Sequence, residues 1–521
     1  MKITKKNTAL TACFMVFATL SAKVCGMLRD IVIAAMYGTN TNEAVAFSSA
    51  SRIPLLFFDI ALGSAVTSAF IPIFNEYLSK DGKKRAIEFS NMFVNLIVLI
   101  TAVLSGVGII FSNQLVRIIA GGYDDEIIRL ISSLLIIIFP TIIFTGLAYC
   151  FVGILQSFGE FYIPSIISLV SNGLLIIYLL VFKNKFGVHG VAVAMLLAWS
   201  TQVLVQIPSL VKNGYRYSLR LSFKDEGIRK VCVLALPIIL STWVQPINNL
   251  INIRLASGLS DTGSVTALDY ANKLYIILVG VFTYSITNLI FPSLSRAQST
   301  GNSKEFSDIV RLAVKYVVII IMPVMAGFLI LNKPIIRLFY ERGMFNSHST
   351  DLTSTALFYY SLGMLGYGIQ EICNKAFYSM RNGKTPMIVS VTGISVNILL
   401  SIILVCLFGQ QHWALAFSAS AAANLMGAAM LILLHRETKD ILNGELLILF
   451  VKIAISTVIM GVCAFACGRL VKGSSKLLEV FVPAAAGAAV YFICCVAFKV
   501  RELTDILNSV LGKIKGGSKN E

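Results

Sequence analysis

The chain has 521 residues, of which 57% are hydrophobic and 13% are charged, and its mean hydropathy is +0.81. Soluble globular proteins carry about 25% charged residues, so this composition excludes an ordinary soluble domain and predicts an all-α, polytopic membrane protein. The formal net charge of +17 is explained by orientation in the membrane and by attraction to lipid headgroups. It does not indicate binding to nucleic acid.

Apolar runs long enough to cross a bilayer, about 20 residues each, recur along the whole chain. Turn-forming stretches such as "SKDGKK", "KNGYRYS" and "RNGKTP" separate these runs. They predict 14 transmembrane helices, at residues 8–38, 43–78, 86–111, 126–156, 161–182, 188–211, 228–258, 263–296, 308–332, 350–380, 385–408, 413–434, 445–468 and 477–498.

The charges of the loops predict the orientation of these spans. The loop after the second span contains Lys80, Lys83, Lys84 and Arg85, and the loop after the sixth span is also basic. Loops of the opposite parity, such as "GTNTNE" and "SGLSDTG", contain no Lys or Arg, although "NKPIIRLFYERG" and "RLVKGSSK" break this pattern. Because basic loops stay on the cytoplasmic side, both termini are predicted to be cytoplasmic.

A weak internal repeat relates the two halves. A shift of 220 residues places Gly38 on Gly258 and Pro72 on Pro292, and the shift becomes 222 further along, consistent with a small insertion in the second copy. Each copy contains six spans of the same orientation, which predicts two parallel six-helix lobes with a substrate site at their interface. The predicted domains are an N-terminal lobe (1–212), a C-terminal lobe (226–436), two additional helices (443–500) and a cytoplasmic tail (501–521).

Several predicted spans contain ionisable residues, each of which costs about 3 kcal/mol at the centre of a bilayer. The first span contains Lys23, Arg29 and Asp30, and the second contains Arg52 and Asp59. Seven residues are nearly two helical turns, so Lys23 shares a helix face with Asp30, and Arg52 with Asp59. The spans of the second half contain Arg254, Asp269, Lys273, Glu371 and Lys375.

The cations among these residues predict a binding site for an anion. Lys23, Arg29, Arg52 and Lys273 outnumber the nearby acids, and an excess of buried cations is costly unless an anion binds there. Guanidinium groups pair with phosphate oxygens through two hydrogen bonds, so phosphate or pyrophosphate is the expected ligand.

The acids among these residues have two interpretations. In one, they only form ion pairs that fix helix packing. In the other they are gating residues, and Asp30 and Asp59 pair with the nearby cations while the protein is empty and release them to the substrate. The gating or ion-pair candidates are Asp59, Arg254, Asp269, Glu371 and Lys375.

Motifs for nucleotide hydrolysis and for catalysis are not found in the sequence. It contains no G-x-x-x-x-G-K-[ST] loop and no soluble segment long enough for an ATPase domain. The ten cysteines show neither metal-ligand spacing nor a disulfide framework. The sequence therefore predicts a transporter rather than an enzyme, without a cofactor or metal, driven by a gradient or by the mass action of its substrate.

Several stretches resemble the MurJ/MviN family: "AKVCGMLRD", "SRIPLLFFDIALGSAVTSAFIPIFNEY", "NLIFPSLSR", "RLFYERGMF" and "AFYSMRNGKTP". Members of this family are bacterial lipid II flippases of the multidrug/oligosaccharidyl-lipid/polysaccharide exporter superfamily. The resemblance implies a location in the bacterial plasma membrane and two lobes around a cationic cavity that opens alternately inward and outward. It also implies that the last two helices form a groove for the isoprenoid tail.

The resemblance also bears on individual residues. Arg29 and Asp30 match the R-D pair of the family, whereas Lys23 and Lys273 stand where many relatives carry arginine. Phe58 takes the place of another cavity arginine, which makes this cavity less basic and leaves the headgroup contacts open. The residues predicted to bind substrate are Lys23, Arg29, Asp30, Arg52 and Lys273.

The implied function is translocation of lipid II, the undecaprenyl-pyrophosphate-linked peptidoglycan precursor, from the inner to the outer leaflet. One alternative is export of another lipid-linked intermediate, such as a teichoic-acid precursor. Another is a non-transporting membrane scaffold that binds cell-wall enzymes or lipid headgroups. The buried cations favour transport, because a scaffold does not need charges inside its spans.

Overall fold

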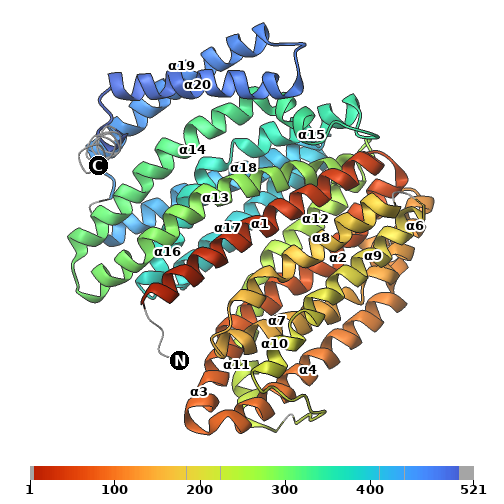
Figure 1. Cartoon of the computed structure of the whole chain (residues 1–521). Helices are drawn as coiled ribbons and strands as arrows, with labels where there is room; N and C mark the ends of the chain where they lie inside the picture. The colour runs from red at the N-terminus through yellow and green to blue at the C-terminus, as the bar shows by residue number, and fades with distance from the viewer. Residues whose placement is uncertain (1–4, 183–184, 223, 410, 439–440, 504–521) are drawn as a thin grey trace, which may run out of the picture. The chain divides into compact units, whose positions relative to one another are not determined.

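The computed structural model describes residues 5–182, 185–222, 224–409, 411–438 and 441–503 (Figure 1). Within these ranges every regular element is a helix, which confirms the predicted all-helical membrane fold. Contacts between Cα atoms divide the chain into two compact units. Unit 1 comprises Met1–Thr266 and Arg342–Ser349, and unit 2 comprises Ala267–Glu341 and Thr350–Glu521.

Unit 1 contains the first twelve α-helices and one π-helical turn. They are α1 (Lys5–Tyr37), α2 (Asn42–Ala65), η1 (Val66–Phe70), α3 (Ile71–Lys80), α4 (Gly82–Ile110), α5 (Ser112–Ala120), α6 (Asp125–Ile138), α7 (Thr141–Ser157), α8 (Tyr162–Phe182), α9 (Gly187–Leu204), α10 (Ile207–Lys212), α11 (Glu226–Thr242) and α12 (Val244–Ser257).

Unit 2 holds most of the remaining helices, although α13 and α15 begin in residues of unit 1. They are α13 (Ser264–Ser299), α14 (Ser303–Phe339), α15 (Ser347–Ser361), α16 (Met364–Ser379), α17 (Lys384–Ile402), η2 (Ile403–Leu407), α18 (Trp413–Thr438), α19 (Gly444–Leu470) and α20 (Lys476–Ala497).

The predicted spans coincide with helices in the described residues. Ten helical segments there are long and apolar enough to cross a membrane. The other four predicted spans are also helical, formed by α1, by α2 with α3, by α11 with α12, and by α15 with α16. These four contain most of the ionisable residues singled out above. Helices suit such segments because they satisfy backbone hydrogen bonds internally, where lipid cannot.

Some spans contain local breaks that hydropathy does not reveal. The second span is interrupted by the π-helical turn η1 just before Pro72 of α3. The helix α14 continues beyond the predicted end at residue 332, through Pro334, with a kink at Leu331 where φ is −103° and ψ is 16°. A proline removes one intrahelical hydrogen bond, which accounts for a kink in the preceding turn.

The core of unit 1 is built around stacked aromatic rings. Phe70 of η1 stacks on Phe93 of α4 with ring centroids 4.5 Å apart, and on Phe89 at 5.6 Å. All three side chains are buried. The helices α11 and α12 also belong to this unit, where they pack against α2 and α5. The boundary between lobes at residues 212–226, drawn from the repeat, stays a prediction.

Unit 2 contains a close contact between α16 and α18. A Cβ atom on Gly366 would lie 2.4 Å from Cα of Asn424, and one on Gly427 would lie 2.4 Å from the carbonyl oxygen of Gly366. Only glycine permits such an approach of two backbones, a device that is common between membrane helices.

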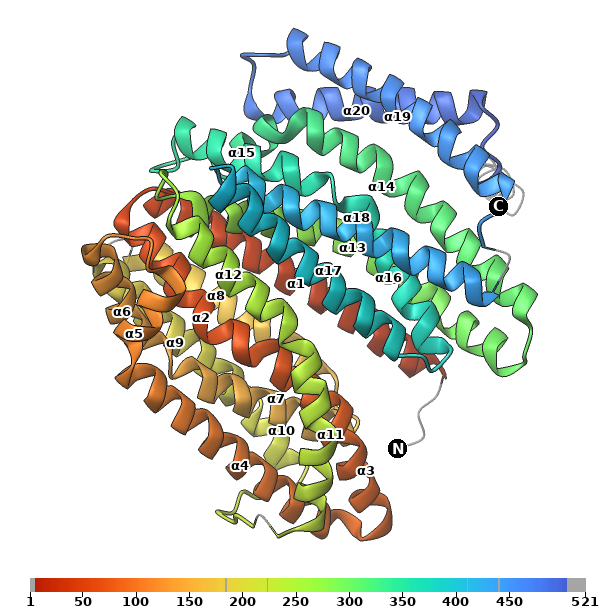
Figure 2. The same ribbon diagram turned by 180° about the vertical axis from the view of Figure 1, so that it is seen from behind.

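The last two helices, α19 and α20, form a hairpin that packs on α14 (Figure 2). The hydroxyl of Tyr491 in α20 donates a hydrogen bond of 2.7 Å to the carbonyl oxygen of Ile319 in α14. Lys315 of α14 pairs with Glu502, just after α20, at 2.8 Å. The hairpin is therefore fastened to α14 by polar contacts as well as by apolar packing.

Candidate functional site

Arg29 is held at the seam between α1 and α8. Its Nε and Nη2 atoms donate to the same oxygen of Asp30, at 3.0 and 2.8 Å, and its Nη1 donates to the side-chain oxygen of Asn172 at 2.9 Å. Gly26, one turn earlier on α1, faces the same asparagine, since a Cβ there would lie 3.7 Å from its Nδ2. The small residue allows α8 to approach and orient the guanidinium.

The burial of this group differs between its members. Only 8% of the Asp30 side chain is accessible, against 19% of the Arg29 side chain. A ligand can therefore reach the arginine without access to the carboxylate beneath it. The ion pair also fixes the plane of the guanidinium, which suits recognition of a planar pair of oxygens.

The other two cations of unit 1 are placed on the same two leading helices. Lys23 lies on α1 and Arg52 on α2, and both are partly buried. The charge of Arg52 acts on Tyr123, in the loop before α6. Burial raises the pKa of Tyr123 above its ordinary range, and the charge of Arg52 opposes that rise.

In unit 2, Lys273 of α13 pairs with Asp269 one turn earlier, with Nζ and Oδ2 2.9 Å apart. Asp269 is buried, whereas about a third of the lysine side chain is accessible, at 36%. The ammonium also lies 5.8 Å from the ring centroid of Tyr270, within range of a cation–π contact. This arrangement repeats the pattern of unit 1, in which a buried acid holds a more accessible cation.

The remaining candidates occupy separate places. Arg254 is exposed in the last turn of α12. Glu371 and Lys375 lie one turn apart on α16, both partly buried, and the lysine ammonium is 5.7 Å from the ring centroid of Phe291. The side chain of Asp59 lies outside the described residues.

Asn172 was missed by the reasoning from sequence. It lies 143 residues from Arg29 and is 9% exposed. Its Nδ2 donates to the carbonyl oxygen of Ser168 at 2.8 Å, which fixes the side-chain oxygen toward the arginine. The available signal was an asparagine in the middle of an apolar span, because an amide is rarely placed there without a polar partner.

No described group of three or more His, Cys, Asp or Glu residues could hold a metal ion. The described cysteines are all free thiols.

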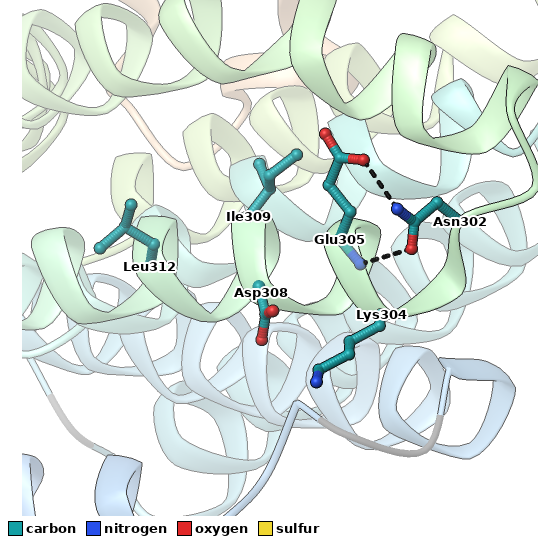
Figure 3. Close-up of a pocket in the computed structure, with 6 residues that line it drawn as sticks. All are labelled: Asn302, Lys304, Glu305, Asp308, Ile309 and Leu312. Atoms are coloured by element: carbon teal, nitrogen blue, oxygen red, sulfur yellow. Dashed lines mark hydrogen bonds between the residues drawn. The ribbon is translucent and has the colours of Figure 1, made fainter.

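A hollow of about 470 Å³ lies at the start of α14 (Figure 3). Two of its polar residues cap the helix, because Asn302 accepts from the backbone nitrogen of Glu305 at 3.1 Å and donates to its carboxylate at 3.0 Å. The lining also contains Lys304 and Asp308. Two carboxylates beside one ammonium do not favour an anion, so this hollow is not a candidate for the site.

Comparison with known families identifies the class of protein. The model of the family "Lipid II flippase MurJ" matches residues 33–486 of the chain. The chain belongs to this family. The expected resemblance to MurJ proteins is thereby confirmed, and the chain is a membrane transporter rather than an enzyme.

Individual MurJ proteins are similar over most of the chain. A probable lipid II flippase MurJ from Treponema pallidum is 28% identical over 492 residues, covering 91% of this chain and 92% of the relative. The one from Buchnera aphidicola subsp. Schizaphis graminum is 29% identical over 413 residues, covering 78% and 79%.

Solved structures agree with this membership. A lipid II flippase MurJ in an inward closed conformation superposes with a TM-score of 0.79 at 25% identity, covering 93% of this chain and 98% of the other. An inward-facing MATE family transporter of the MOP superfamily has a TM-score of 0.69 at 15% identity, covering 80% and 95%. The second likeness concerns the fold alone.

Proposed function

We propose that the chain translocates lipid II from the inner to the outer leaflet of the bacterial plasma membrane by alternating access. The observation that carries this proposal is the MurJ family match over residues 33–486, together with cations inside the spans. The substrate carries a pyrophosphate between its sugar-peptide head and its isoprenoid tail, and such a group needs cationic partners in a low-dielectric site.

We propose that Arg29 is the principal pyrophosphate ligand, assisted by Lys23 and Arg52. The support is its partial accessibility and its orientation by Asp30 and Asn172. Lys273, held by Asp269, belongs to the same proposal as a further substrate contact. None of these contacts involves covalent chemistry, so their contribution is binding and orientation.

Asp30 and Asp269 give the empty protein ion pairs that the substrate-loaded protein exchanges for contacts with pyrophosphate. Asp30 pairs with Arg29 in the empty protein, and the incoming pyrophosphate competes for the same N–H donors. Asp269 and Lys273 offer the same exchange. A substrate shifts a conformational equilibrium only through different affinities for the two states, and this exchange of partners is a source of that difference.

Both termini are proposed to be cytoplasmic. In support, the two most basic loops lie at the same end of unit 1, because Arg85 pairs with Asp225 at 2.5 Å. Asn91 and Asn95 of α4 hold the second of these loops through hydrogen bonds to the backbone carbonyls of Arg216 and Arg220, at 2.9 and 2.8 Å. A cysteine placed at the exposed Lys224 should resist an impermeant maleimide added outside intact cells. Efficient labelling from outside would contradict this orientation.

The substrate is tested with purified protein in vesicles. Vesicles carrying fluorescent lipid II are compared with vesicles carrying a lipid-linked teichoic-acid precursor, and the fraction of headgroups that crosses the bilayer is measured. We expect lipid II to cross faster, and Arg29→Ala to abolish the difference. Equal or faster transfer of the teichoic-acid precursor would assign the chain to that substrate instead.

A further inference from the structure

A groove of about 370 Å³ follows the seam between α1 and α8 in unit 1. Apolar side chains form its walls: Ile31, Val32, Ala35 and Met36 from α1, and Leu179 and Leu180 from α8. Arg342, from the segment between α14 and α15 that belongs to unit 1, adds a guanidinium to this lining. Neither Arg29 nor Asp30 lines the groove, so it is separate from the proposed pyrophosphate ligands.

The wall on α8 continues into a surface suited to lipid. Leu180 is 59% exposed, and its neighbours Ile177 and Val181 are exposed to a similar extent. Because α8 is long and apolar enough to span a membrane, these side chains are expected to face acyl chains. A flexible hydrocarbon chain can therefore enter the groove from the bilayer without crossing water.

The backbone conformation of the next two residues holds Arg342 beside the end of α1. The next residue, Gly343, has φ of +58°, and a Cβ atom there would lie 2.2 Å from the carbonyl oxygen of Ala35. The same carbonyl accepts a hydrogen bond of 2.9 Å from the backbone nitrogen of Met344. Carbonyls in the last turn of a helix lack intrahelical donors, and this turn of chain supplies one.

Further contacts keep this segment on unit 1. Ser349 accepts a hydrogen bond of 2.8 Å from the hydroxyl of Thr39, and His348 lies 2.7 Å from a carboxylate oxygen of Asp261. Arg342 is thus held near the C-terminal end of α1, where the helix dipole also favours a cation. Arg342 therefore lines the apolar groove near the end of a membrane span.

We propose that this groove binds an anionic phospholipid of the surrounding bilayer, with one acyl chain along the α1–α8 seam and the phosphate on Arg342. The apolar walls match the chain, and arginine pairs with phosphate through two parallel hydrogen bonds. A zwitterionic lipid offers the same phosphate together with a cation that opposes Arg342, so the site selects net negative headgroups. The bound lipid braces the 342–349 segment against α1.

The test is lipid retention by purified full-length protein in detergent, measured by native mass spectrometry. The protein is incubated with equal amounts of phosphatidylglycerol and phosphatidylcholine. We expect the wild type to retain phosphatidylglycerol in preference to phosphatidylcholine. Arg342→Gln should weaken that binding about tenfold, the scale of one charge-assisted bidentate contact.

Two further variants distinguish lipid binding in this groove from a general effect of losing one positive charge. Val32→Phe fills the groove without changing charge, and it should lower phosphatidylglycerol retention as Arg342→Gln does. Arg129→Gln removes an exposed cation of α6 in the same unit, and it should leave retention unchanged. Melting temperatures with and without phosphatidylglycerol check that each variant is folded, since a ligand of the folded state raises its stability.

Three results would overturn the proposal. One is equal retention of the two lipids by the wild type, and another is an equal loss in Arg342→Gln and Arg129→Gln. The third is loss of lipid II binding in Val32→Phe with normal retention of phosphatidylglycerol, which would assign the groove to the substrate tail. Because the readout is lipid binding, failure of this proposal does not affect the proposed flippase activity.

Discussion

Two groups of ion pairs in this protein, one in each unit, use the same chemistry in different surroundings. In unit 1, Arg29 is paired with Asp30 and is accompanied on α1 and α2 by the cations Lys23 and Arg52. In unit 2, Arg337 at the end of α14 pairs with Glu479 of α20 at 2.7 Å. Arg29 of the first group keeps part of its side chain accessible beside the buried Asp30, whereas the second group pairs two cations with two carboxylates.

The balanced cluster joins three parts of unit 2. Glu341, after α14, accepts a hydrogen bond of 2.7 Å from Thr350 of α15 and lies 3.6 Å from the ammonium of Lys476 at the start of α20. Lys476 also donates to the carbonyl oxygen of Glu341. Glu479 is 6% exposed, and its second oxygen accepts from the backbone nitrogen of Gly473 at 2.9 Å.

This difference separates a group suited to binding from one suited to structural support. Two cations and two carboxylates that satisfy each other have no need of a ligand, so the unit 2 cluster is expected to hold the α19–α20 hairpin on α14. Arg29 remains partly accessible beside its buried partner Asp30, so the unit 1 ion pair is expected to exchange that partner for an anion. The following substitutions should affect transport in one cluster and stability in the other.

The largest effect is expected for Arg29→Ala. It removes the guanidinium proposed to hold the pyrophosphate, and flux per folded molecule should fall by about tenfold or more, the scale of a charged hydrogen bond. A reconstituted flipping assay measures the flux, and a melting curve corrects for the folded fraction. Arg29→Lys keeps the positive charge but loses the two parallel N–H donors of the guanidinium. Its flux should lie between that of the wild type and that of Arg29→Ala. Normal flux in Arg29→Ala would remove this residue from the binding site.

Glu479→Gln should act on stability instead. The buried carboxylate loses its charge beside Arg337, which should lower the free energy of unfolding by about 1–3 kcal/mol, while flux per folded molecule stays unchanged. Glu445→Gln, on the exposed start of α19, is the matched control and should have almost no effect. A loss of flux without loss of stability would show that the unit 2 cluster takes part in transport.

A smaller effect is expected from acid on Glu341. Burial raises the pKa of this carboxyl, but the hydrogen bond from Thr350 and the charges of Lys476 and Arg337 outweigh it, so the folded pKa lies below its ordinary value. Its contribution to stability is therefore complete above the unfolded pKa, about 4.3. That contribution is lost as the pH falls through the depressed folded pKa.

Melting temperatures between about pH 5 and pH 3 measure this contribution, in the range where carboxylates titrate. The wild type should lose more stability over this range than Glu341→Gln, which has no carboxylate to protonate. Parallel curves for the two proteins would show that the Glu341 contacts contribute little to the balanced cluster.

The smallest effect is expected for Lys23→Arg. The substitution keeps the positive charge and supplies the guanidinium that, by resemblance, many MurJ relatives carry at this position. Flux should therefore change by no more than about twofold, the scale of a tolerated substitution. Lys23→Ala should reduce flux more strongly, because it removes the positive charge. If both variants behave alike, Lys23 acts by packing and not by charge.

Much of the fold could be predicted from the sequence because helix formation in a membrane is a local requirement. Runs of apolar residues must satisfy their own backbone hydrogen bonds, and the predicted spans accordingly coincide with helices. The ionisable residues inside the spans could also be picked out, since a charge among apolar neighbours is visible without any structure. The same local reasoning did not reveal the π-helical turn at η1 or the kink at Leu331.

Contacts between distant parts of the chain could not be predicted in this way. Arg29 meets Asn172 of α8, and the segment Arg342–Ser349 joins unit 1 although its neighbours in sequence belong to unit 2. The helices α11 and α12 likewise belong to unit 1, where they pack against α2 and α5. Such assignments depend on which surfaces pack together.

The sequence by itself determined the class of protein, its helices and the set of ionisable residues that lie inside the membrane spans. It did so because hydropathy and charge act through each residue's own transfer between water and lipid. Only the tertiary structure decided that Arg29 meets Asn172, that Arg337 meets Glu479 and that the guanidinium of Arg342 borders the apolar groove. Those outcomes depend on side-chain distances of about 3 Å, which are set by the packing of helices that lie far apart in the chain.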